Sequence, residues 1–217
     1  MREYFEKQME QLNKELIQMG TSIENAIEMA VSALENRDVD KAKKAIDMDS
    51  MIDRKERDIE SLCMKLLLLQ QPMAGDLRII SAALKMITDM ERIGDQAADI
   101  SEITILLADA GNPVNLETIR KMAVETIYMV NQSVEAFVGR NLTLAEQVIA
   151  HDDIVDALFL QAKKDLTQLM KQNTQDSEQA ADLLMVAKYF ERIGDHAVNI
   201  AEWVIYFMSG SHDTPVI

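Results

Sequence analysis

Residues 90–95 read Met-Glu-Arg-Ile-Gly-Asp, and residues 190–195 read Phe-Glu-Arg-Ile-Gly-Asp, so the second stretch repeats the first 100 positions later. Further upstream, Asp49 and Asp53 correspond to Asp152 and Asp156 at an offset of 103 positions. A period of this length is too long for a solenoid repeat, and it instead predicts two homologous halves joined in tandem.

Helix-breaking residues are scarce, with only 7 Gly and 3 Pro among 217 residues. A β-sandwich, a β-barrel or a doubly wound α/β fold needs many Gly and Pro turns, and an aromatic content of 5% also disfavours sheets. Apolar residues recur with helical period between the few breakers, and Asp38 is well placed to cap the second helix. This pattern predicts long helices at about residues 3–34, 39–70, 75–109, 116–138, 142–172 and 177–208.

The predicted fold is therefore all-α, with two tandem homologous three-helix bundles of long antiparallel helices. The first bundle is expected to span residues 1–110 and the second residues 114–210, with residues 211–217 as a tail. Two homologous halves of three helices each account for the length of the chain.

The net charge of −15 restricts the partners of this chain. Such a field repels phosphate backbones and anionic lipid headgroups, so we expect no direct nucleic-acid binding and contact with a membrane only through partner proteins. The single cysteine, Cys63, allows no internal disulfide, and the sequence contains neither an apolar signal core nor a run of ~18 apolar residues. We expect a cytoplasmic protein.

Acidic side chains are predicted to continue the apolar faces of four helices. On the third helix, the stripe Leu77, Ile80, Leu84 and Ile87 leads at helical spacing to Glu91. The second, fifth and sixth helices repeat this pattern. The resulting candidate metal ligands are Asp49, Asp53, Glu91, Asp95, Asp99, Asp152, Asp156, Glu191, Asp195 and Asn199.

Carboxylates four residues apart on a helix lie one turn apart, within reach of one bound object. Gathered without water, they must be protonated, paired with Arg or Lys, or bound to a cation. A set of oxygen ligands without Cys and with little His selects hard divalent or trivalent ions, so iron, manganese, magnesium or calcium is favoured over zinc. Carboxylates from two helices can also bridge several ions in one cluster.

These acids could form either a solvated surface or a buried cluster between helices. The simpler interpretation is a solvated acidic face in which Arg92 and Arg192 pair with neighbours. However, Gly94 and Gly194 each cost about 1 kcal/mol relative to Ala within a helix, and a close approach of helices beside the acids would explain them. No catalytic residues are predicted.

Two other classes of protein remain as alternatives. One is a carboxylate-bridged diiron oxidase, which uses Glu-x-x-His motifs. None of the three His residues has a Glu three positions before it, because Val148, Ile193 and Ser209 occupy those positions. The other alternative is a purely structural helical interaction module.

Four stretches together resemble the PhoU family. They are Gln70-Gln71-Pro72, Asp76-Leu77-Arg78, residues 89–95 and residues 189–200. The resemblance covers essentially the whole chain and includes its duplication. It implies two three-helix bundles in a protein that is often dimeric and is not an enzyme.

The resemblance also implies a function. Proteins of this family are negative regulators of phosphate signalling that link a high-affinity phosphate ABC importer to a sensor histidine kinase. They bind metal clusters through E/DxxxD motifs, which correspond here to Asp49 with Asp53, Glu91 with Asp95, Asp152 with Asp156, and Glu191 with Asp195. Asn199 fits the family pattern, whereas Asp99 departs from it, and Glu178 stands where the first half has Arg78. The two halves therefore need not be equivalent.

Overall fold

Six long helices make up the computed structural model, which describes residues 2–69, 74–110, 114–172 and 177–210. Their boundaries lie within three residues of those predicted from the breaker pattern, so the all-α prediction is confirmed. The helices are α1 Arg2–Asn36, α2 Val39–Leu69, α3 Ala74–Leu106, α4 Glu117–Gly139, α5 Leu142–Gln172 and α6 Ser177–Ser209.

The helix ends follow from local chemistry. Asp38 Oδ1 accepts a hydrogen bond from the Lys41 backbone N–H at 3.0 Å, as expected of an N-cap. Arg37 and Arg140, 103 positions apart, follow α1 and α4 with positive φ of 52° and 50°, so the same turn recurs in both halves. Helix α3 ends at Leu106 rather than near residue 109. The Leu107 N–H makes the last α-helical hydrogen bond, to Ile103 O, and the Ala108 and Ala110 N–H groups donate instead to carbonyls three residues earlier.

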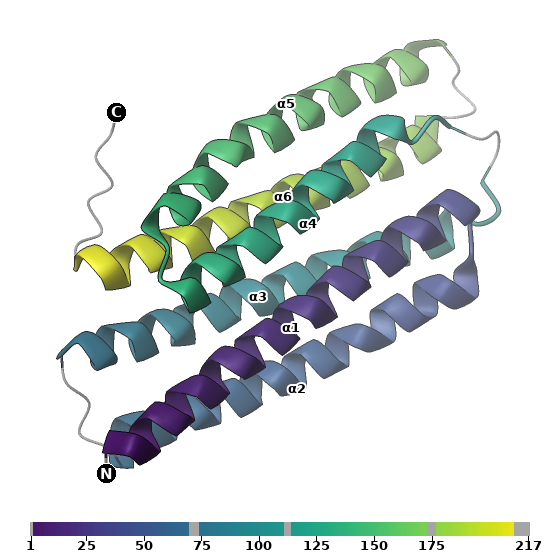
Figure 1. Ribbon diagram of the computed structural model, residues 1–217. Coiled ribbons are helices and arrows are strands. Elements are labelled where there is room, and N and C mark those ends of the chain that lie inside the picture. Colours follow the sequence, from purple (N-terminus) through teal and green to yellow (C-terminus); the bar gives the residue numbers. More distant parts are fainter. Residues whose placement is uncertain (1, 70–73, 111–113, 173–176, 211–217) are drawn as a thin grey trace.

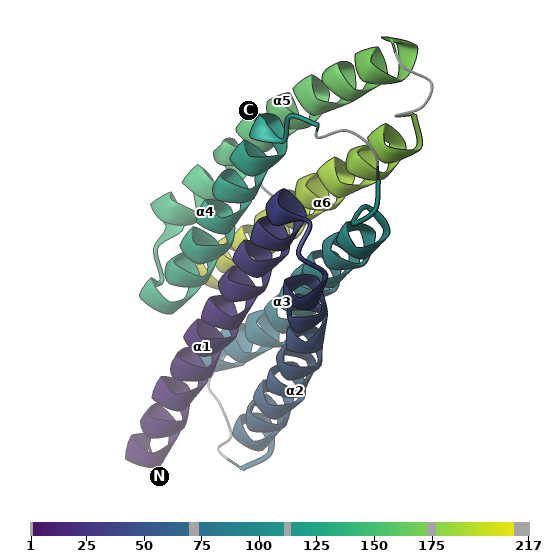
Figure 2. The same ribbon diagram turned by 90° about the vertical axis from the view of Figure 1, so that its right-hand side faces the viewer.

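The helices form two sets of three, α1–α3 and α4–α6, as Figure 1 shows. Helices α3 and α6 pack against each other between the two sets, and α1 and α4 lie side by side on one face of this pair (Figures 1 and 2). Within the described ranges, α2 and α5 contact only helices of their own set. The tail predicted for residues 211–217 lies outside the described residues.

One continuous hydrophobic core runs through both sets. The face predicted for α3 is partly wrong: Ile80 and Ile87 are buried, but Leu77 is 49% exposed and Leu84 is only half-buried. Because α1, α2 and α6 all contact α3, its buried face is wider than one stripe and is turned towards Ala83, Met90 and Ala97. The acidic side chains therefore lie at the edge of the core rather than in line with it.

No helix in the described part of the chain is both long enough and apolar enough to cross a membrane.

Candidate metal centres

The first acidic cluster lies where α2 packs against α3. Asp49 and Asp53 from α2 lie near Asp95 of α3, and Glu91 adjoins Asp95 one turn earlier. Glu91, Asp95 and Asp53 have side chains that are 22%, 31% and 36% exposed, so water reaches the outer part of the cluster. The structure thus brings together the four acids that the first pair of motifs predicted.

Asp49 is the innermost acid of the first cluster. Its Oδ1 atom is buried and has no hydrogen-bond partner among the described residues. Burial, followed by the negative charges of Asp95, Asp53 and Asp99, raises the pKa of Asp49 to about 6. A Cβ atom placed on Gly94 would lie 3.3 Å from this oxygen, so the predicted close approach at this glycine is confirmed.

Asp152 occupies the corresponding position in the second cluster, between α5 and α6. Its Oδ1 atom is also buried and unpartnered within the described ranges, and a Cβ atom on Gly194 would lie only 2.9 Å from it. Burial, followed by the charges of Asp156, Asp195 and Glu191, raises the pKa of Asp152 to about 6. The two halves therefore repeat the same arrangement of a dry carboxylate oxygen against a helix glycine.

The outer acids are paired with basic side chains of their own helices. Arg92 Nη1 donates to Asp95 Oδ2 at 2.9 Å, and Arg57 Nη1 lies 3.8 Å from Asp53 Oδ2. In the second half, Lys188 pairs with Glu191. Because Arg92 and Arg57 are 57% and 61% exposed, these ion pairs are screened by water and contribute little to stability.

Asp99 and Asn199 make contacts across the two halves. The Tyr189 hydroxyl of α6 donates a hydrogen bond to Asp99 of α3, and Asn199 Nδ2 of α6 donates to Asp89 Oδ1 of α3 at 3.0 Å. The two contacts are equivalent under the repeat of 100 positions, because position 89 corresponds to position 189 and position 99 to position 199. His196 Nδ1 adds a third contact, 2.9 Å from the same oxygen of Asp89. Asp99 is still close enough to raise the pKa of Asp49.

Sequence reasoning missed one member of the first cluster, Glu56. Its charge raises the pKa of Glu91, and burial followed by the charges of Glu60 and Asp53 raises its own. The sequence does contain a signal for Glu56, because this residue follows Asp49 and Asp53 at helical spacing on α2 and therefore shares their face. Its counterpart at the offset of 103 is Phe159, whose ring lies 5.5 Å from Lys188 Nζ. The first cluster is therefore the more acidic of the two.

The donor atoms suit a hard cation in both halves. Among the described residues, each cluster has a buried carboxylate oxygen without a hydrogen-bond partner, further carboxylates close by and no Cys, which is the donor chemistry that magnesium, calcium, manganese and iron prefer. In the part of the chain that the structure describes, no three His, Cys, Asp or Glu side chains are already arranged to hold a metal ion. Binding would therefore draw the outer carboxylates away from Arg92, Arg57 and Lys188.

Comparisons with known proteins agree with this organisation. The sequence model of the PhoU domain matches residues 16–104 and again residues 119–204, once in each half. A phosphate-specific transport system accessory protein PhoU homolog from Clostridium acetobutylicum is 36% identical over 210 residues, covering 96% of each chain. A protein of the same name from Aquifex aeolicus is 38% identical over 204 residues, covering 94% of this chain and 92% of its own.

A solved structure shares the fold over nearly the whole chain. The crystal structure of PhoU from Pseudomonas aeruginosa superposes with a TM-score of 0.90 at 32% identity, covering 95% of this chain and all of that one. The fold and the duplicated acidic clusters thus define an all-α protein built from two homologous halves. The chain belongs to the PhoU family.

Proposed function

We propose that this chain is a cytoplasmic, metal-binding accessory protein of phosphate transport that acts as a negative regulator of phosphate uptake and of the phosphate-starvation response. In this role it links a phosphate ABC importer to a sensor histidine kinase, and it acts as a homodimer. The full-length likeness to named accessory proteins of phosphate-specific transport supports the accessory role. The long helices also supply extended faces for such partners.

The metal-binding part of the proposal rests on the buried Oδ1 atoms of Asp49 and Asp152, which have no hydrogen-bond partner in the described part of the chain. A hard cation, once bound, would supply the positive charge that these oxygens lack. In the first half Asp49, Asp53, Glu91, Asp95 and Asp99 would hold it, and in the second half Asp152, Asp156, Glu191, Asp195 and Asn199. Several ions per half are compatible with ligands from two helices.

Deletion of the gene is expected to derepress phosphate uptake. A strain without this protein should express a phosphate-starvation reporter in phosphate-rich medium, and the wild-type gene supplied in trans should restore repression. Unchanged reporter activity in the deletion strain would contradict the regulatory role and favour the alternative of a purely structural helical module.

Metal occupancy is expected to divide between the halves. Asp95→Asn should remove about half of the metal bound by gently purified protein, Asp195→Asn the other half, and the double variant essentially all of it, because each residue serves only its own cluster. Elemental analysis before and after EDTA treatment measures this, with Asp165→Asn as the control for one lost surface charge. Loss of all metal from either single variant, or no stoichiometric metal in the wild type, would refute separate centres.

A further inference from the structure

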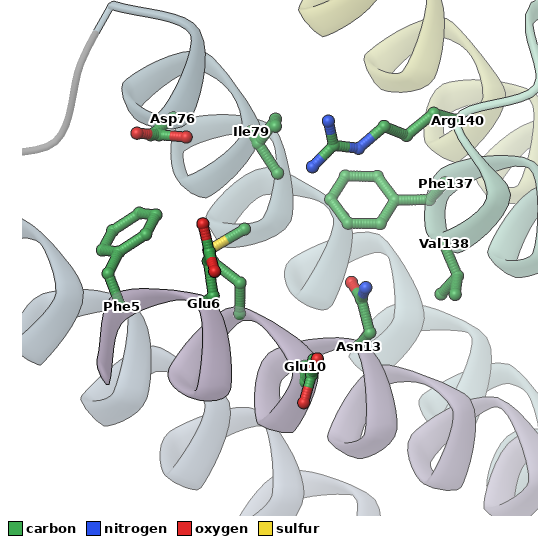
Figure 3. A pocket seen from close by; sticks show the side chains of 10 residues that line it. Phe5, Glu6, Glu10, Asn13, Asp76, Ile79, Phe137, Val138 and Arg140 are labelled. Atoms are coloured by element: carbon green, nitrogen blue, oxygen red, sulfur yellow. The ribbon is translucent and has the colours of Figure 1, made fainter. Parts of the chain in front are cut away.

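Two neighbouring cavities follow one another along the junction of α1 and α4. The first, of about 290 Å³, is lined by the start of α1, the start of α3 and the end of α4, and Figure 3 shows Glu6 and Arg140 directed into it. The second, of about 360 Å³, lies between the middle of α1 and the last turns of α4. Val138 lines both cavities. We call this surface the α1–α4 groove.

The groove has the length of a short helix. On α1 its lining includes Glu6, Asn13 and Gly20, which are seven residues apart and therefore share one face. From Glu6 to Thr21 the wall rises about 22 Å at 1.5 Å per residue, which matches about four turns of a docked helix. At Gly20 a Cβ atom would lie 3.4 Å from Val134 Cγ2, so α1 and α4 approach closely there.

Apolar side chains line much of the groove. Ile17 of α1, which is 49% exposed, lines the second cavity together with Val134 and Val138 of α4. In the first cavity, Phe5, Ile79 and Phe137 extend the apolar lining. An amphipathic helix would cover this surface with apolar residues spaced three and four positions apart.

The rim of the groove is acidic. Glu6, Glu10 and Asp76 surround the first cavity and Glu135 borders the second, whereas Arg140 is the one basic residue on the described lining. This local excess has the same sign as the net charge of −15, so a positively charged partner is attracted to the groove. The same charge opposes a second copy of this chain as the occupant.

We propose that the α1–α4 groove binds a basic amphipathic helix of a partner protein. The inference rests on the proposed adaptor function, because an adaptor needs a surface for its partners, and it goes further by naming the surface and the chemistry of the partner segment. The groove lies apart from the acidic clusters, which are formed between α2 and α3 and between α5 and α6.

The test uses a fluorescent 16-residue peptide with Leu along one helical face and Lys on the other faces. Fluorescence anisotropy with the full-length protein should show binding at least tenfold tighter than for a scrambled peptide of the same composition, in which the Leu residues share no face. Glu6→Lys/Glu10→Lys should weaken binding at least tenfold. The control Glu146→Lys/Asp165→Lys makes the same charge change on exposed positions of α5 and should leave binding within twofold.

Ile17→Asp should also weaken binding, because it removes an apolar contact without adding a positive charge. Amide chemical-shift changes on adding the peptide should cluster in residues 5–21 and 131–140. Equal binding of the scrambled peptide, equal effects of the two double variants, or shift changes confined to other helices would overturn the proposal. So would a dimer in sedimentation that Glu6→Lys/Glu10→Lys dissociates, since a second copy would then occupy the groove.

Failure of this inference can be distinguished from failure of the proposed function. The reporter and metal-content experiments depend on the whole gene and on the acidic clusters, not on the groove. A deletion strain that derepresses the reporter, together with a protein that does not bind the peptide, would refute the groove alone. Peptide binding together with an unchanged reporter would refute the regulatory role and leave the groove standing.

Discussion

Metal-free Asp49→Asn/Asp152→Asn protein is expected to melt roughly 5–10 °C above the metal-free wild type at pH 7.5. Each aspartate has its pKa raised from 3.8 to about 6 by burial and by neighbouring carboxylates. A pKa shift of this size lowers the free energy of unfolding by about 3 kcal/mol at pH 7.5, and screening by water reduces this cost to about 1–2 kcal/mol per site. For a chain of this size, each kcal/mol changes the melting temperature by about 2–4 °C.

The pH dependence gives the sign of this effect. Because folding raises the pKa of both groups, the native state retains protons that the unfolded chain releases, and stability falls as pH rises from about 4 through about 6. The advantage of the double variant should therefore be about a third of its full size at pH 4.5 and nearly complete above about pH 7. Scanning calorimetry across this range checks it, with Asp47→Asn/Asp165→Asn as the exposed control.

A divalent cation should reverse the order of stability. Added Mn²⁺ is expected to raise the melting temperature of the wild type, because it binds the native carboxylates and not the unfolded chain. The double variant should respond much less. Equal melting temperatures without metal at pH 7.5, or equal responses to Mn²⁺, would show that these two oxygens carry no unusual electrostatic cost.

Gly94→Val is expected to destabilise the protein by about 2–3 kcal/mol, because even a Cβ atom at this position would meet Ile52 Cδ1 at 3.0 Å and Ile52 Cγ2 at 3.2 Å. The β-branched Ile52 has little rotamer freedom to move aside. Gly194→Val should have a comparable cost, because it would press on Asp152 Oδ1 and on Val155 Cγ1. Urea unfolding of the metal-free proteins measures both changes.

Gly75→Val is the matched control for these substitutions. Gly75 also lies in α3, but a Cβ atom there meets nothing within 4 Å among the described residues, so Val should be neutral or slightly stabilising. If Gly94→Val and Gly75→Val had equal effects, the glycine in the motif would not be required for close packing of α2 against α3.

The six helices and the duplication could be predicted from the sequence because the signals are local. Gly and Pro are so rare that the helix boundaries had few alternatives, and Asp38 marks one of them directly. The orientation of the helix faces was predicted less well, as Leu77 shows. The helical period identifies which apolar residues share one stripe. The centre of the buried face, however, depends on how many helices pack around α3, and the described helices α1, α2 and α6 all contact it.

The acidic clusters could be predicted in membership but not in detail. The i, i+4 pairs identified four acids in each half, and Gly94 and Gly194 indicated the side on which α2 and α5 pack. Contacts between the halves, such as that of Asp89 with Asn199, could not be predicted, because helical periodicity says which residues share a face and not which face lies opposite. Metal content stays a prediction from the chemistry of these acids.

The contacts between α3 and α6 show that the two halves of the chain are not interchangeable. Asp89 contacts Asn199, and Asp99 contacts Tyr189, so each contact pairs a carboxylate with a neutral hydrogen-bond donor. Two copies of the first half, paired in the same register, would instead set the carboxylate of Asp89 against that of Asp99 and repel each other. The two halves of this chain therefore carry unlike, complementary side chains at this contact, and an isolated first half would be a poor partner for itself.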